Sequence, residues 1–596
     1  MKNRSHLRLL MAAALMLLAF VVTACGSDDE PSSSSGTATN TDQSKVIEEG
    51  GQQGGKLTQL GGSDVDFLDP GHSYYTAGFQ VIYATNRTLY SFKPDDGTNP
   101  VPDLAEADPQ ISDDKKTVTV KIRQGVKFGP PVNREVVADD VKYAIERFFS
   151  VNVGGQYPGY FAPIVGTPKK PTEGVKPISG ITTPDKYTIV FKLSQPVGVS
   201  FAAALVMPVT SPVPRDFAQE FDAKSPSTYN THVISSGPYM VKNDAQGNTT
   251  GYKAGKSIDL VRNPNWDGKA TGDYRPAYLD EIFLRTNATD ANVASKQVLD
   301  GSAKVLDTNP PANILKDVVT DIKDQYVTVP SGGYRYFPMN TTVKPFDDIN
   351  VRRAVMAGFS RDAARKARGG KFTGSLPTHF LPPEFPGFDE AGGEEGFGLD
   401  YLSKDNEKGD LDVAAKYFKL AGYKSGKYEG DEEILMVGSN VDPGKAQAEV
   451  AQAQLEKMGF KVRLRLVPQD AVYTEWCQVP AKNVGMCAGA GWFKDFADPQ
   501  SMLEPVFKGS LITETGNINY SELKDPKVDA AMDKAALLEG DERLQAWADI
   551  DKMIVEDAAA IPFLWDNTTL IRSKDVNGVA ASYYTAWDLN FTSIKK

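Results

Sequence analysis

Residues 433–467 read EILMVGSNVDPGKAQAEVAQAQLEKMGFKVRLRLV. The apolar run at 433–437 predicts a buried strand, and residues 445–458 have the length and composition of a helix. Gly459 follows that helix, where a glycine commonly ends it, and residues 460–467 predict a second strand. The stretch therefore predicts a β-α-β unit and an α/β second half of the chain.

The first half of the chain carries more strand patterns. Residues 115–123 (KKTVTVKIR) alternate with a period of two, and residues 186–193 (KYTIVFKL) predict another strand. Residues 138–149 predict a helix with Asp139 and Asp140 at its capped start. Strands and helices are thus mixed throughout, with the first half richer in β-structure.

Composition limits the size and the partners of the folded part. The chain has 596 residues, of which 41% are hydrophobic and 24% are charged. About 540 of them follow a polar amino-terminal segment, which is too long for one core and predicts two or three lobes. The formal net charge is −12, so a polyanionic partner such as DNA is not expected.

The amino terminus has the pattern of a secretory signal. A basic start is followed by an apolar run at 9–22 and by small residues before Cys25. A run of about 14 residues is shorter than the roughly 20 that span a membrane. We interpret residues 1–24 as a lipoprotein signal peptide, with lipid on Cys25 as a membrane anchor. The alternative is an ordinary cleaved signal with a chance cysteine.

A polar tether favours the lipoprotein interpretation. Residues 26–55 contain no aromatic residue and almost no large aliphatic one. Such a segment buries too little apolar surface to fold, so residues 25–55 are predicted to be a flexible tether.

The two remaining cysteines, Cys477 and Cys487, are ten positions apart. Outside the cytoplasm such a pair most often forms a disulfide, whereas a zinc site needs more ligands than this. A Cys477–Cys487 disulfide is predicted to brace the segment that leads to Trp492. No metal site and no cofactor are expected.

Specific strings go further than composition. They occur in the order 66–70 (DFLDP), 101–105 (VPDLA), 122–128 (IRQGVKF), 138–143 (ADDVKY), 236–239 (SGPY), 260–266 (LVRNPNW) and 347–355 (DDINVRRAV). Together they resemble the peptide/nickel class of solute-binding proteins of ABC importers, which contains oligopeptide- and dipeptide-binding proteins. Residues 129–131 (GPP) depart from that family, which usually has His-Asp-Gly there. The length and the cysteine pair look like actinobacterial lipoprotein members.

The resemblance implies a two-lobed periplasmic-binding-protein-like fold of class II, with an extra subdomain in the first lobe. Lobe 1 would comprise residues 56–330 and 560–596, with the inserted subdomain at about 96–204. Lobe 2 would comprise residues 331–559. Residues 333–337 and 560–565 would be hinge strands, and closure of the hinge would enclose a ligand.

The segment 489–499 (GAGWFKDFADP) is the main candidate for ligand contact. Small residues at 488–491, including Ala490 and Gly491, allow close approach of another backbone, and Trp492 offers a rigid face. In peptide-binding relatives the aspartate three residues after this tryptophan receives the ligand's amino group, and Asp495 occupies that position. The alternative is a buried tryptophan followed by a helix-capping aspartate, which suits Asp498 better.

Two further pairs are candidates. Tyr74 and Tyr75 follow the DFLDP string, and one of them is expected to face the ligand because neighbours in a strand point to opposite sides. Arg335 and Tyr336 lie in a predicted hinge strand, where they would meet a ligand carboxylate or, equally, backbone carbonyls.

The resemblance implies an extracytoplasmic receptor, lipid-anchored to the cell membrane. It would act as a monomer that captures oligopeptides and delivers them to an ABC permease. One alternative is the same fold with another solute: a nickel chelate, haem, glutathione or an oligosaccharide. A second alternative is a surface hydrolase or a sensory or adhesive lipoprotein. No G-x-S-x-G or H-E-x-x-H string occurs, so an enzyme is not expected.

Overall fold

The computed structural model describes residues 50–322 and 324–595. The signal peptide, Cys25 and all of the tether up to residue 49 lie outside these residues. In the described part of the chain, no helix is long and apolar enough to cross a membrane.

The first sheet has six strands and contains the start of the described chain. Strand β1 (Lys56–Leu60) runs parallel to β11 (Glu281–Arg285) on one side and to β12 (Lys304–Leu306) on the other. Alternate residues of these strands, including Leu57 and Ile282, are fully buried. The antiparallel strands β10 (Ser257–Arg262), β9 (Tyr252–Lys253) and β8 (Tyr239–Val241) complete the sheet.

The second sheet contains the predicted β-α-β unit. Strands β15 (Glu433–Ser439) and β16 (Lys461–Val467) pair in parallel, and α11 (Gly444–Lys457) connects them. Gly459 ends the connection with φ +102°, and a Cβ there would lie 2.4 Å from the Tyr428 carbonyl oxygen. Strand β17 (Met486–Cys487) adds a third parallel strand beside β15. The prediction for this stretch is confirmed.

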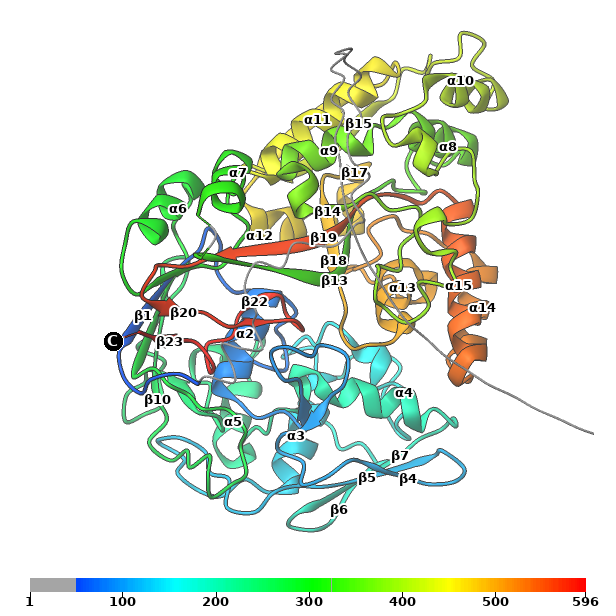
Figure 1. The fold of residues 1–596 in the computed structure, drawn as a ribbon. Helices are drawn as coiled ribbons and strands as arrows, with labels where there is room; N and C mark the ends of the chain where they lie inside the picture. Colours follow the sequence, from blue (N-terminus) through cyan, green and yellow to red (C-terminus); the bar gives the residue numbers. More distant parts are fainter. Residues whose placement is uncertain (1–49, 323, 596) are drawn as a thin grey trace, which may run out of the picture. The chain divides into compact units, whose positions relative to one another are not determined.

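Two long strands form the centre of the third sheet, which has four strands (Figure 1). Strand β13 (Tyr326–Pro338) pairs antiparallel with β19 (Ala560–Ile571). Strand β18 (Ala490–Phe493) lies along the other side of β13 and forms one edge of this sheet, and β14 (Gly374–Ser375) forms the opposite edge. The two predicted hinge segments are therefore paired strands.

The fourth sheet confirms the strands predicted in the first half. Strand β5 (Thr117–Lys121) pairs antiparallel with β7 (Thr188–Lys192), and β4 (Gln110–Ile111) and β6 (Ile181–Asp185) flank them. Helix α3 (Ala138–Phe148) contacts this sheet. At its start the Asp140 carboxylate accepts a hydrogen bond from the Val137 amide at 2.9 Å.

Further helices are α2 (Thr76–Thr85), α4 (Gly198–Ala203), α5 (Arg215–Asp222), α6 (Ala291–Leu299), α7 (Ala312–Asp321), α8 (Ile349–Gly358), α9 (Arg361–Arg368), α10 (Leu411–Leu420), α12 (Gln469–Ala471), α13 (Pro499–Phe507), α14 (Pro526–Ala535) and α15 (Gly540–Glu556). Short strand pairs are β2 (Tyr90–Ser91) with β3 (Val101–Pro102), β20 (Val576–Asn577) with β23 (Ser593–Ile594), and β21 (Ala580–Ala581) with β22 (Ala586–Trp587).

The buried apolar residues fall into four clusters. The largest draws only on residues between Tyr334 and Trp565. The other three draw on residues from Leu57 to Val329 and from Leu570 to Leu589, with Phe496 as the one exception. The first and last parts of the chain therefore share the three smaller clusters, and the stretch between Tyr334 and Trp565 forms the largest cluster.

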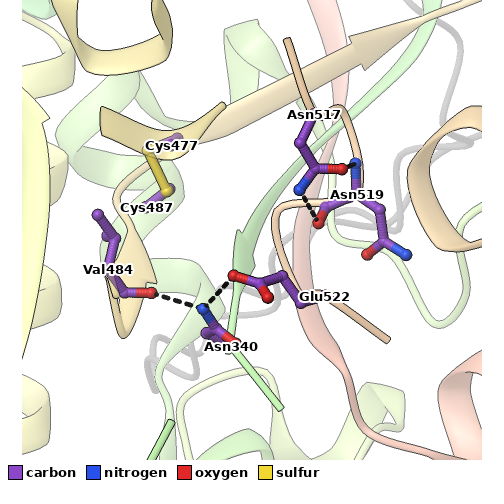
Figure 2. Close-up of a disulfide and its surroundings, with 7 residues drawn as sticks. All are labelled: Asn340, Cys477, Val484, Cys487, Asn517, Asn519 and Glu522. Carbon is purple, nitrogen blue, oxygen red and sulfur yellow. Dashed lines mark hydrogen bonds between the residues drawn. A yellow bond between two sulfur atoms is a disulfide. The ribbon is translucent and has the colours of Figure 1, made fainter. Parts of the chain in front are cut away.

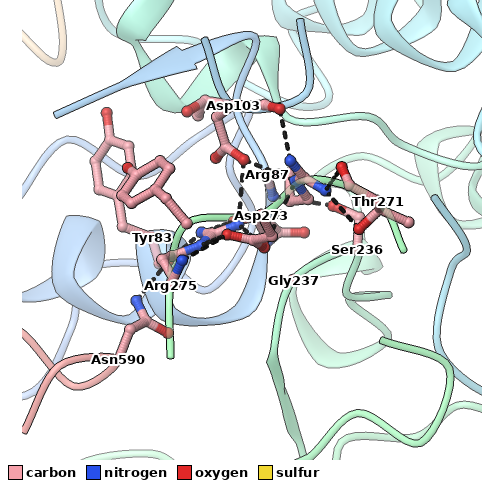
Figure 3. Close-up of polar contacts among 12 residues, drawn as sticks. Tyr83, Arg87, Asp103, Ser236, Gly237, Thr271, Asp273, Arg275 and Asn590 are labelled. Carbon is pink, nitrogen blue, oxygen red and sulfur yellow. Dashed lines mark hydrogen bonds and ion pairs between the residues drawn. The ribbon is translucent and has the colours of Figure 1, made fainter. Parts of the chain in front are cut away.

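Two of the sequence strings quoted above, 101–105 (VPDLA) and 236–239 (SGPY), contribute to packing in the fold. In Figure 3, the Arg87 guanidinium donates to the Asp103 carboxylate, with Nε 2.7 Å from Oδ1, and the Arg87 amide donates to Ser236 Oγ at 3.0 Å. A Cβ on Gly237 would lie 2.8 Å from the Asn86 amide nitrogen, so only glycine allows this approach. Because the Arg87 and Asp103 side chains are fully buried, removing either would leave an uncompensated charge.

The predicted disulfide is present. Figure 2 shows the bond between Cys477, at the end of the π-helix η8 (Val472–Cys477), and Cys487 in β17. Nearby, the Asn340 side chain donates to the Val484 carbonyl at 3.2 Å and to Glu522 Oε1 at 2.8 Å. The bond thus holds the helical turn after β16 against the third strand of the second sheet.

Candidate ligand-binding site

A cavity of about 380 Å³ lies where two sets of parallel strands end. Residues that follow β1, β11 and β12 line one side, and residues that follow β15, β16 and β17 line the other. They include Ser63, Asp64, Ala288, Thr289, Asp307, Asn309, Val441, Asp442, Gln469, Asp470, Ala488 and Gly489. In open α/β sheets ligands bind beyond the carboxyl ends of parallel strands, and this cavity meets that condition on both sides.

The third sheet supplies another part of the lining. Arg335 in β13 is paired in register with Gly491 in β18, and both line the cavity. A Cβ on Gly491 would lie 2.3 Å from Arg335 Nη1. The sequence predicts that small residues here admit another backbone; at Gly491 the space is filled by the Arg335 side chain instead.

Asp495 lies in the cavity wall, just after β18, and is 4% exposed. Its Oδ2 accepts hydrogen bonds from the hydroxyl groups of Tyr74 at 2.6 Å and Tyr160 at 2.7 Å. The Tyr583 hydroxyl donates to the backbone carbonyl of Asp495 at 2.6 Å. Burial raises the pKa of the carboxyl to about 7, and the two tyrosine hydrogen bonds oppose that shift. In the described residues, Oδ1 accepts no hydrogen bond, so it is the oxygen open to a ligand.

Tyr74 and Tyr75 both line the cavity, and which of them faces a ligand stays a prediction. They do not lie in a strand: Tyr75 is the residue just before α2, so the alternation of a pleated strand does not apply. The Tyr75 ring packs edge-on against Tyr473, with ring centroids 6.0 Å apart. Its hydroxyl is buried and has no hydrogen-bond partner among the described residues.

Trp492 lines the cavity and also supports it. Its Nε1 donates to the Ser501 carbonyl at 2.8 Å, and its ring packs edge-on against Tyr74 with centroids 5.8 Å apart. Helix α13 starts after Asp498, whose carboxylate accepts from the Gln500 amide at 2.9 Å and pairs with Arg543. Asp498 is therefore the capping residue, as the sequence indicates.

Ala490 and Tyr336 are not among the residues that line this cavity, and their role as ligand contacts stays a prediction. The two residues are paired in register across β18 and β13, and they are 1% and 0% exposed. Successive residues of a strand point to opposite faces, so the face shared by Arg335 and Gly491 excludes both neighbours. Tyr336 instead packs in the largest core cluster.

Arg335 forms an ion pair with a buried aspartate and donates to no backbone carbonyl of the described residues. Its Nε donates to Asp566 Oδ2 at 2.6 Å, and Arg368 donates to both oxygens of the same carboxylate. The Arg335 guanidinium lies over the Phe493 ring, 4.9 Å from its centroid. Its side chain is 19% exposed, so one face remains open to the cavity.

Sequence reasoning missed other ionisable residues of the lining, among them Lys494, Arg368 and Asp307. Lys494 Nζ donates to the Ser582 carbonyl at 3.1 Å, and burial lowers its pKa to about 8. Its position beside Asp495 was the available signal. Tyr160 and Tyr583 were missed because they lie 335 and 88 residues from Asp495 in the sequence. Among the described residues, no cluster of three or more His, Cys, Asp or Glu side chains is arranged to hold a metal ion.

Comparison with known families agrees with this architecture. The model of the bacterial extracellular solute-binding proteins, family 5, matches residues 99–513. The chain belongs to this family.

Relatives of this family 5 protein extend over most of its length. The periplasmic oligopeptide-binding protein of Escherichia coli K12 is 25% identical over 527 residues, which cover 87% of this chain and 88% of the relative. The haem-binding protein A of Haemophilus influenzae is 27% identical over 508 residues, or 82% of each chain. Both relatives are named as binding proteins.

The solved structure of clavulanic acid biosynthesis oligopeptide binding protein 2 has the same fold. It superposes with a TM-score of 0.75 at 25% identity and covers 92% of this chain and 100% of its own. The predicted periplasmic-binding-protein-like α/β fold is thereby confirmed. As a family 5 member, the protein is an extracytoplasmic solute-binding component of an ABC importer.

Proposed function

We propose that this protein captures short peptides in the cavity and delivers them to its ABC permease. The observation that carries the proposal is the carboxylate of Asp495, which is buried in the cavity wall and whose only side-chain partners among the described residues are tyrosine hydroxyl groups. A peptide's amino-terminal ammonium would supply the missing positive charge, through a charge-assisted hydrogen bond to Oδ1. The names of the relatives as oligopeptide-binding proteins support the same ligand class.

The edge position of β18 supports an extended ligand. Strand β18 pairs with β13 on one side and forms the edge of the described sheet on the other. A peptide that lies along this edge would use its backbone amides and carbonyls, which are common to all peptides, for affinity. Gly491, Trp492 and Phe493 would border it. Its side chains would then reach the loops at the strand ends, where bridging water tolerates variety.

The division into lobes is part of the proposal. The core clusters support a first lobe of residues 56–330 and 560–596, with the inserted subdomain at about 96–204, and a second lobe of 331–559. In that division Asp495 belongs to the second lobe, while Tyr74, Tyr160 and Tyr583 belong to the first. Their hydrogen bonds would then be contacts of the closed form, strengthened when a ligand binds between the lobes.

The anchor completes the proposal. Lipid on Cys25 would hold the receptor at the cell membrane, and the polar segment up to residue 55 would let it reach the permease. Mass spectrometry of the mature protein tests this step. A diacylglyceryl adduct on Cys25 would support it, and a free amino terminus at another residue would contradict it.

Asp495→Asn tests the peptide proposal directly. The substitution keeps the shape of the side chain and removes its charge, so affinity for alanine peptides is expected to fall by at least about 30-fold, from the 2 kcal/mol or more lost with a buried charge pair. Calorimetry with free and amino-acetylated peptides measures this loss. Acetylation should weaken binding to the unmodified protein strongly and to Asp495→Asn very little.

Asp442→Asn is the matched control, because Asp442 also lines the cavity but its carboxylate accepts from the Ala446 amide within its own turn. The affinity of Asp442→Asn for alanine peptides should remain within about threefold of that of the unmodified protein, which is the usual size of effects from surface substitutions. Equal binding of free and acetylated peptides would contradict the ammonium site. Binding of haem without any peptide binding would move the ligand class to that of the haem-binding relative.

A further inference from the structure

A second carboxylate in the cavity has no role in the proposed capture of the ammonium. Asp307 follows β12 directly, and its amide donates to the Leu60 carbonyl at 3.1 Å. Its carboxylate lies against Gly61: a Cβ there would be 2.3 Å from Oδ2 and 2.8 Å from Oδ1. Glycine at 61 therefore makes room for the Asp307 carboxylate at the carboxyl ends of β1 and β12.

Asp307 is partly exposed, and its carboxylate lacks the partners that the fully buried aspartates have. Asp69 and Asp222 share the Arg147 guanidinium, and Asp566 pairs with two arginines. Asp307 Oδ1, by contrast, is buried and has no hydrogen-bond partner in the described part of the chain. Burial raises the pKa of Asp307 to about 7, and only its own backbone amide opposes that shift. An unpaired buried carboxylate lowers stability unless something outside the chain pairs with it.

The charged residues that line the cavity favour a positively charged ligand. Its ionisable lining residues are five aspartates and three basic residues: Asp64, Asp307, Asp442, Asp470, Asp495, Arg335, Arg368 and Lys494. Arg335 and Arg368 are already paired with Asp566, which reduces their effect on a ligand. Polar residues such as Ser63 and Asn309 also line the cavity beside Asp307 and Asp64. Their side-chain oxygens can accept hydrogen bonds from a bound ammonium or guanidinium group.

Access to Asp307 is from the cavity. Asp307 also lines a small recess of about 10 Å³ together with Gln59, Gln80 and Arg285, and Arg285 is already paired with Asp259. That volume holds at most about one water molecule. A charged partner for Asp307 would therefore have to come from the main cavity, whose lining also includes Asp307.

The geometry points to Asp307 as a specificity-determining residue that binds a cationic side chain, lysine or arginine, of the captured peptide. This inference rests on the proposed peptide function and names the substrate class: short peptides with one basic side chain. Asp495 would bind the ammonium common to all peptides, and Asp307 would select among them. Pairing with the side chain would give the Asp307 carboxylate the partner that it lacks among the described residues.

A lysine scan through alanine pentapeptides tests the inference. Calorimetry compares each lysine peptide with the same peptide carrying norleucine, which has a similar apolar stem and no charge. We expect the unmodified protein to favour lysine over norleucine by at least tenfold at one position. Asp307→Asn should abolish that preference and still bind the all-alanine peptide as the unmodified protein does.

Asp470→Asn is the matched control, because Asp470 is an exposed carboxylate of the same cavity. It should keep the lysine preference, since solvent screens its charge. Thermal unfolding at pH 8 adds an independent readout. Asp307→Asn is expected to unfold at the same or a higher temperature, whereas an aspartate with a structural role would leave the variant less stable.

The outcomes separate the two proposals. Binding of alanine peptides without a lysine preference at any position would overturn the Asp307 site and leave the ammonium site standing. A lysine preference that survives in Asp307→Asn would also overturn it. Failure of every peptide to bind the unmodified protein would overturn both.

Discussion

Asp495 and Asp307 share a physical condition: burial shifts the pKa of each carboxyl to about 7. They differ in their partners, because Tyr74 and Tyr160 donate hydrogen bonds to Asp495 and no described side chain does so for Asp307. Without ligand, both carboxyl groups titrate near neutrality. A bound cation favours the charged carboxylate, so binding displaces the proton.

This condition predicts how peptide affinity depends on pH. Only the carboxylate form of Asp495 attracts an ammonium, and that form declines below about pH 7. Affinity for an all-alanine peptide is expected to fall about tenfold for each pH unit below 6.5, because one proton must leave for each peptide bound. Calorimetry between pH 5 and 7 measures the slope, and Asp495→Asn should show none. A flat profile in the unmodified protein would contradict the assignment of the ammonium to Asp495.

The raised pKa of Asp495 affects folding stability in the opposite direction, because stability falls as pH rises. The native carboxyl holds its proton up to about pH 7, whereas the unfolded one releases it near the ordinary value of 3.8. The unfolded state therefore binds fewer protons between these values, and the contribution of Asp495 to stability declines as pH rises from about 4 to about 7. A peptide ammonium that pairs with the carboxylate restores that stability.

At the scale of elements, the disulfide holds part of the cavity wall. Gln478 and Ala488, each next to one of the cysteines, line the cavity. Replacing both cysteines by alanine is expected to cost roughly 2–4 kcal/mol of unfolding free energy, the usual range for a native disulfide. It should also weaken peptide binding, because the turn after β16 loses its tie to β17.

Thermal unfolding and calorimetry of the double variant measure both effects. Reducing agent should lower the melting temperature of the unmodified protein and leave that of the double variant unchanged. Equal stability and affinity in the two proteins would show that the packing around Cys477 and Cys487 suffices without the bond.

The sequence predicts elements better than it predicts which side chains meet. The β-α-β unit at 433–467 and the strands around 115–123 and 186–193 follow from local periodicity, and the structure has them. The contact faces of β13 and β18 depend on register with a distant strand, so local periodicity does not tell that Ala490 and Tyr336 face away from the side shared by Arg335 and Gly491. Asp307 was missed because β12 has three residues, too few for a pattern, and its proximity to Gly61 is visible only in three dimensions.

At the scale of the whole molecule, two kinds of contact bridge the proposed lobes. One is the buried hydrogen bond from Tyr160 to Asp495, and the other is the exposed ion pair between Lys115 and Glu539, whose side chains are about 41% and 42% exposed. Exposed pairs contribute at most about 1 kcal/mol, whereas hydrogen bonds to buried charged groups contribute about 1.5–3 kcal/mol. Closure should therefore depend on the buried contact.

The comparison of two variants tests this expectation. Tyr160→Phe is expected to weaken peptide binding about tenfold or more, and Lys115→Ala by less than about fivefold, from those ranges. Small-angle X-ray scattering with saturating peptide follows closure as a decrease in radius of gyration. Equal effects of the two substitutions would mean that the buried contact has no special part in closure.

The placement of the cavity at the ends of six parallel strands separates recognition from folding. Asp64 and Asp307 are partly exposed, and Asp442 and Asp470 are exposed, so none of the four is buried in a core. Exchange of the loops that carry such residues changes what is recognised without repacking the cores. The chain is therefore a natural scaffold for engineered sensors: a dye at exposed position 470 would report occupancy, while new loop sequences would set the analyte.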